Sequence, residues 1–150
     1  MRAQALRAEA IKLRRAPIWV AYVALPLIAA VIGTFNYQNN LEMLTPGWEN
    51  LWTQQTLFVC YFFLPALVGA AASHLWRLEH QGSNWNALMS RPVPTWQIIA
   101  AKTVSVAVLA AVMQLVFVLA LTLIGAGLIG LPGMLPARYL ATSGLIVIAC

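Results

Sequence analysis

The sequence contains no aspartate and only four glutamates among its 150 residues. Charged residues of both signs make up 9% of the chain and hydrophobic residues 61%, whereas an average soluble domain carries about 25% charged residues. A soluble fold of this size could not cover its surface with so few charges. A soluble domain with a very large core is therefore disfavoured, and the composition indicates a membrane protein.

Catalytic and nucleotide-binding patterns are also missing. The chain has no Gly-x-x-x-x-Gly-Lys-Ser/Thr loop and no His-Glu-x-x-His. The nearest metal candidate is His74 with Glu79 and His80, but histidines six residues apart lie on different faces of a helix. Cys60 and Cys150 both lie in apolar runs, which favours small hydrophobic side chains over a disulfide. We therefore predict no catalytic residue, no cofactor and no metal site, and no enzyme activity in this chain.

Long uncharged runs take the place of these motifs. Helical residues rise about 1.5 Å each and a bilayer core is about 30 Å thick, so three runs are long enough to span it: residues 17–35, 56–76 and 103–130. A fourth run, 138–150, stops after about a dozen residues, too few to cross the core. We predict an all-α, polytopic transmembrane protein with three full spans and the start of a fourth, as a fragment of a longer membrane domain or a truncated gene product.

Basic residues fix the expected orientation. Five of the nine precede the first apolar run, in residues 1–16, and three more lie in residues 77–102, whereas the outer connections carry none besides Arg138. Lys and Arg remain on the cytoplasmic side, so we predict a multi-pass protein of the cell membrane with a cytoplasmic N-terminus. Because these charges follow the topology and form no single basic face, the net charge of +5 does not predict a nucleic-acid partner.

Residues 1–16 show helical spacing of apolar residues, with basic residues over most of the remaining faces. This pattern predicts an amphipathic helix that lies along the membrane surface. A cleavable signal peptide is the alternative. It is disfavoured because the basic region is long and no small-x-small cleavage site precedes a polar mature domain.

A few residues within and beside the spans predict helix packing. Gly69 and Ser73 form a small-x-x-x-small pair that would let another helix approach closely. Gln114 is the clearest polar residue inside a span and predicts an interhelical hydrogen bond, with a substrate contact as the alternative. Trp48 and Trp52, four residues apart after Thr-Pro-Gly, predict the interfacial face of a short helix.

The segment 77–102 concentrates polar residues in an otherwise apolar chain. Its 26 residues exceed the about 2–8 of an ordinary helix connection. Gly82 and Pro92 would bound a short helix, and Thr95 is a plausible N-cap for the following span. A plain solvated loop is the alternative, but a short helix with one apolar face favours docking of a soluble partner. The predicted partner-binding residues are Glu79, Trp85, Leu88, Met89, Arg91 and Pro92.

These residues carry a family resemblance. The stretches "AEAIKLRRAPIW" and "EHQGSNWNALMSRPVPTWQIIAAK", separated by a span, resemble ABC-2 type permeases over roughly residues 8–130. The chain is most similar to the branch that includes lantibiotic-immunity ABC transporter permeases. Their first cytoplasmic loop carries a matching pattern, here Glu79, Asn84, Trp85, Leu88, Pro92 and Lys102. Two features depart from the family: the chain has fewer spans, and Trp96 stands where a basic residue is usual.

The resemblance implies a permease subunit powered by a separate ATPase subunit and paired with a second permease subunit in a homo- or heterodimer. Residues 1–16 would form its elbow helix, and residues 77–102 its coupling segment. The transporter would export a substrate, with an antimicrobial peptide or a lipid-like molecule among the candidates. One alternative is a membrane scaffold or assembly subunit that recruits a soluble partner through residues 77–102. Another is a membrane-embedded enzyme.

Overall fold

The computed structural model describes residues 7, 10–13, 16–80, 86, 90 and 94–149, apart from the side chains of residues 78 and 79. These residues contain no β-strand, which confirms the predicted all-α class. Two of the helical elements are π-helices, labelled η. The elements are α2 (Ile18–Asn39), α3 (Trp48–Phe58), η1 (Val59–Phe63), α4 (Leu64–His80), α6 (Thr95–Leu123), η2 (Ile124–Ile129) and α7 (Ala137–Ala149).

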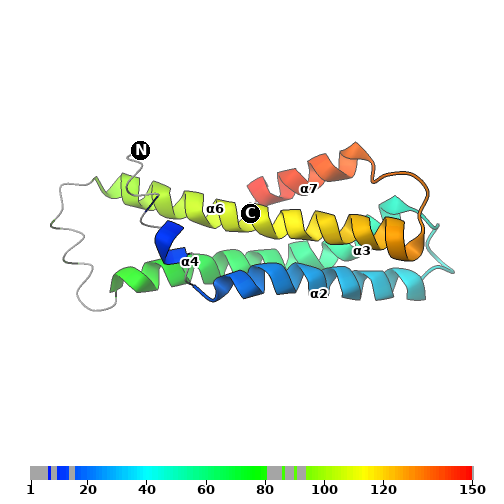
Figure 1. Ribbon diagram of the computed structural model, residues 1–150, viewed down its shortest axis with the longest axis horizontal. Helices are drawn as coiled ribbons and strands as arrows, with labels where there is room; N and C mark the ends of the chain where they lie inside the picture. The colour runs from blue at the N-terminus through cyan, green and yellow to red at the C-terminus, as the bar shows by residue number, and fades with distance from the viewer. Residues whose placement is uncertain are drawn as a thin grey trace.

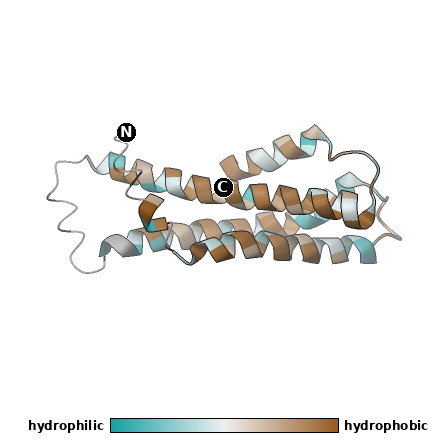
Figure 2. Cartoon of the chain, in the orientation of Figure 1, coloured by the Kyte–Doolittle hydropathy of each residue, from teal (hydrophilic) through white to brown (hydrophobic). Residues whose placement is uncertain are grey.

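Three long helices lie side by side along the length of the molecule (Figure 1). They are α2, the continuous helix Trp48–Arg77, and the helix Thr95–Ile129 formed by α6 and η2. Each is long and apolar enough to cross a membrane, which confirms three spans. Apolar residues cover most of their length (Figure 2). Many of these residues are exposed, as expected of surfaces that face lipid.

The helix boundaries differ from the apolar runs. The second long helix begins at Trp48, eight residues before residue 56, because one face of its otherwise polar first turns is buried within the bundle. Leu51 and Gln55 are fully buried there. The third long helix begins at Thr95 rather than near residue 103. The prediction that Thr95 caps this helix is wrong: Pro94 occupies the cap position without a side-chain hydrogen bond, and Thr95 is already helical.

A π-helix accommodates the proline in the middle of the second long helix. Pro65 has no N–H to donate, and its ring would clash with the carbonyl four residues earlier in a regular α-helix. Immediately before it, the Leu64 N–H donates to the Val59 carbonyl, five residues back. The wider turn of η1 absorbs the disturbance, so the helix continues to His80.

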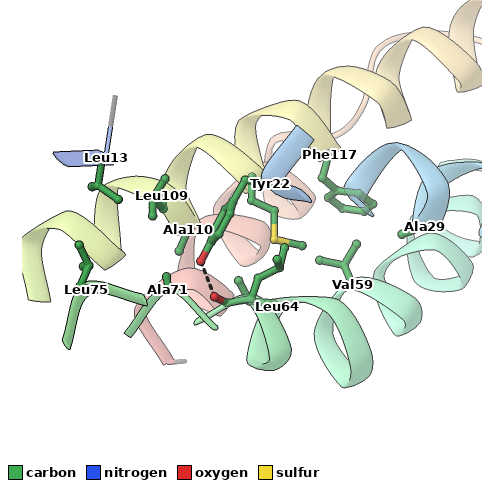
Figure 3. Close-up of a cluster of buried hydrophobic side chains, with 12 residues drawn as sticks. Leu13, Tyr22, Ala29, Val59, Leu64, Ala71, Leu75, Leu109, Ala110 and Phe117 are labelled. Carbon is green, nitrogen blue, oxygen red and sulfur yellow. Dashed lines mark hydrogen bonds between the residues drawn. The ribbon is translucent and has the colours of Figure 1, made fainter. Parts of the chain in front are cut away.

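The main core lies where the three long helices meet (Figure 3). The fully buried Tyr22 hydroxyl of α2 donates to the Leu67 carbonyl of α4 at 2.7 Å. Leu13, from the N-terminal segment, is buried in the same cluster, and its carbonyl accepts from Trp19 Nε1 at 2.8 Å. The helical residues 10–13 are therefore anchored to the bundle, while the amphipathic character of residues 1–16 as a whole stays a prediction.

Candidate functional site

One end of the bundle gathers the segments that the sequence marks as functional. α4 ends at His80 and α6 begins at Thr95 at this end, where residues 10–13 also lie (Figure 1). We call it the basic end, since Arg77 belongs to the last turn of α4 and Lys12 to residues 10–13. The two helices that flank the predicted coupling segment therefore end and begin at the same end of the bundle.

The predicted partner-binding residues themselves lie almost entirely beyond these flanks. Glu79 belongs to the last turn of α4, but its side chain lies outside the described residues. The others also lie outside the described residues: Trp85, Leu88, Met89, Arg91 and Pro92. Their role in binding an ATPase remains a prediction from the sequence.

Lys102 is a buried residue that sequence reasoning treated as part of the cytoplasmic segment. Its side chain is 4% exposed, and its Nζ donates to the Leu75 carbonyl at 2.8 Å. The ammonium also lies 5.4 Å from the ring centroid of Trp76. These contacts join α6 to the last turns of α4. Helical spacing was the signal for this burial, because Lys102 shares a face with Ser105 and Leu109, which are also buried.

The two predicted packing features differ in their surroundings. A Cβ added to Gly69 would meet nothing within 4 Å, and Ser73 is exposed, so this face of α4 is open within the chain. Gln114 is instead buried in the bundle, 7% exposed. Its Oε1 accepts no hydrogen bond from the described residues. The partner helix predicted for each feature therefore stays a prediction.

We expect Gln114→Leu to raise the stability of the isolated chain. A buried acceptor without a partner costs about 1–3 kcal/mol, which an apolar side chain of similar length avoids. Thermal unfolding in detergent measures the change. The matched control is Gln54→Leu, since Gln54 Oε1 does accept from Asn36 Nδ2, and it should lower stability by about 1 kcal/mol. A stability loss in Gln114→Leu as well would show that Gln114 uses its oxygen.

A second buried polar group lies where α2 and α3 approach most closely. Gln55 Nε2 donates to the Thr34 hydroxyl at 3.0 Å, and that hydroxyl donates to the Ala30 carbonyl at 2.6 Å. Gly33 makes the approach possible, because an added Cβ would lie 2.4 Å from the Gln55 Cα. These contacts fix α2 against α3 within the bundle.

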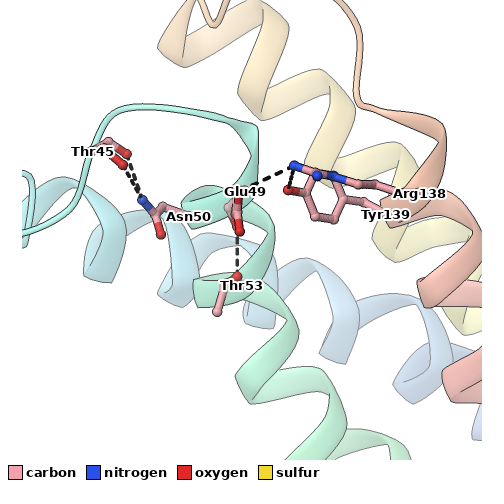
Figure 4. A network of polar contacts seen from close by, with 6 residues as sticks. All are labelled: Thr45, Glu49, Asn50, Thr53, Arg138 and Tyr139. Carbon is pink, nitrogen blue, oxygen red and sulfur yellow. Dashed lines mark hydrogen bonds and ion pairs between the residues drawn. The ribbon is translucent and has the colours of Figure 1, made fainter.

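Aromatic and polar contacts close the opposite end of the bundle (Figure 4). Arg138 donates to Glu49 Oε2 at 3.4 Å, an exposed pair worth little to stability. The predicted interfacial face is covered in part by protein, since Trp48 is buried and Trp52 is partly buried. Trp48 Nε1 donates to the Pro132 carbonyl and Trp52 Nε1 to the Ser143 hydroxyl, each at 3.0 Å.

The three membrane-length helices, with apolar side chains exposed along them, define a polytopic membrane protein. The family model for ABC-2 family transporter proteins matches residues 5–149. Because the match extends over nearly the whole chain, the protein belongs to the ABC-2 transporter family. Membership implies a permease role in the membrane and an ATPase partner. No curated protein and no solved structure matches the chain.

Proposed function

We propose that the chain is a permease subunit of an ABC-2 transporter that uses ATP hydrolysed by a separate subunit to export a substrate. The observation that carries this proposal is the family match over residues 5–149. The absence of a phosphate-binding loop in the sequence is consistent with ATP hydrolysis on another chain. In this proposal the chain performs no catalysis itself.

The coupling segment would transmit the movement of the ATPase through the two helices that flank it. Trp85, Leu88 and Met89 would fill a groove of the ATPase, Glu79 and Arg91 would pair with its charges, and Pro92 would end the docking helix. The hydrogen bond from Lys102 to the Leu75 carbonyl supports this route, since it joins α4 to α6 close to the segment. A push on the segment would then displace both helices together.

The finer features of the proposal concern topology, partner and substrate. The basic end would face the cytoplasm, in agreement with the distribution of Lys and Arg. The open face of Gly69 and Ser73 would pack against a second permease subunit, in a homo- or heterodimer. The similarity of residues 77–102 to lantibiotic-immunity permeases favours an antimicrobial peptide as the substrate.

We expect the double substitution Trp85→Ala with Leu88→Ala to abolish co-purification of the ATPase subunit. Truncating a central interface residue typically costs about 2–4 kcal/mol, so two together weaken binding at least about a hundredfold. The measurement is co-purification of the ATPase subunit with the tagged chain, with membrane insertion checked by fractionation.

The matched control is Ile32→Ala with Phe35→Ala. This pair also joins an aromatic and an aliphatic residue three positions apart, and it lies exposed on α2, outside residues 77–102. It should leave the ATPase bound. Undiminished co-purification with the Trp85 and Leu88 variant would rule out docking through this segment.

A further inference from the structure

A groove of about 520 Å³ lies between α4, α6 and α7. Its volume falls within the range of about 300–1,000 Å³ that is typical of small-molecule sites. Along α6 it extends from Ile99 to Ala110, or about 16 Å at 1.5 Å per residue. The groove is therefore elongated along the helices and long enough to hold a chain-like molecule.

The two ends of this groove differ in chemistry. α4 and α6 run in opposite directions (Figure 1), so Trp76 and Lys102 line it together, toward the basic end. Toward the middle of the bundle the lining is apolar and includes Val68, Ala110 and Val147. A molecule that fits would have a polar, anionic head and an apolar tail, oriented along the helix axes.

Lys102 is held in place at the polar end of the groove. The Leu75 carbonyl and the Trp76 ring fix its ammonium at the wall, at 2.8 Å and 5.4 Å respectively. It lies seven residues into α6, or about 10 Å from the start of that helix. This position immediately precedes the apolar run 103–130, so the ammonium lies where a polar segment meets an apolar helix.

We propose that this groove binds an anionic phospholipid of the surrounding bilayer. Its phosphate would accept a charge-assisted hydrogen bond from Lys102 Nζ, and one acyl chain would lie along Val68 and Ala110. The head group would then lie near the basic end and the acyl chain toward the middle of the bundle. A lipid within one leaflet of a bilayer has this orientation. Basic pockets between transmembrane helices commonly bind such head groups. The proposal does not depend on ATPase coupling or on the transported substrate.

The test uses the whole chain in mixed micelles that contain equimolar phosphatidylglycerol and phosphatidylcholine. Native mass spectrometry of the purified protein should show retained phosphatidylglycerol in clear excess. In Lys102→Gln this preference should fall about tenfold, since a hydrogen bond to a charged group is worth about 1.5–3 kcal/mol. Lys102→Arg should retain it. The control Arg77→Gln changes an exposed charge outside the groove lining and should also retain it.

A second variant separates head-group recognition from the fit of the tail. Ala107→Phe places a ring in the apolar part of the lining and should reduce retention of both lipids while Lys102 is intact. Equal lipid retention in Lys102→Gln, Ala107→Phe and the unmodified chain would overturn the proposal. A bound peptide that is retained in place of lipid, and that is lost in Ala107→Phe, would also overturn it.

Discussion

Gly33→Val is expected to destabilise the bundle by about 3 kcal/mol or more, at the upper end of overpacking effects. The added Cβ alone would lie 2.4 Å from the Gln55 Cα and 2.8 Å from the Gln55 nitrogen. Because these are backbone atoms, no side-chain rotation relieves the contact, and α3 must move away from α2. That movement also breaks the hydrogen bond from Gln55 to Thr34.

Thermal unfolding in detergent measures this effect, and Gly69→Val provides the matched control. Gly69 also lies within a membrane-length helix, but it is exposed, and a Cβ there meets nothing within 4 Å. We expect Gly69→Val to change the free energy of unfolding of the monomer by less than about 0.5 kcal/mol, as for an ordinary surface substitution. The same control tests the predicted role of Gly69 in packing against a second subunit, since only that contact should weaken. Equal melting temperatures for both variants would contradict the close approach at Gly33.

The existence of the spans was predictable because burial in a bilayer requires long uncharged helices, and little else produces such runs. Their boundaries were not. Trp48 and Gln55 lie in the polar stretch 36–55, yet they belong to the second long helix because α2 and the segment around Pro132 cover them. Such coverage depends on tertiary contacts between residues far apart in the sequence, which local polarity does not report.

In the candidate site, too, local composition predicted some features, whereas others depended on tertiary contacts. The polar composition of residues 77–102 led to the prediction of a docking segment, and this role stays a prediction. Lys102 is the last residue of that segment, but its hydrogen bond to the Leu75 carbonyl makes it part of the contact between α4 and α6. Its register with Ser105 and Leu109 carried the information, and the charge alone suggested solvent exposure instead.

Trp48→Ala is expected to lower the free energy of unfolding by about 3–5 kcal/mol. The indole is 8% exposed, and its Nε1 donates to the Pro132 carbonyl, 84 residues away in sequence. The ring also fills the space above Gly125, where an added Cβ would lie 2.3 Å from the ring carbon Cζ3. Removing the ring therefore leaves a cavity and an unpaired carbonyl at the point where α3 meets the connection to α7.

Trp96→Ala is the matched control, because Trp96 is 60% exposed at the start of α6 and should lose less than about 0.5 kcal/mol. Trp48→Phe separates the two contributions, since phenylalanine keeps much of the packing and removes only the hydrogen bond, worth about 1 kcal/mol. The expected order of stability loss is Trp48→Ala, then Trp48→Phe, then Trp96→Ala. If Trp96→Ala cost as much as Trp48→Ala, tryptophan content rather than closure of this end of the bundle would determine stability.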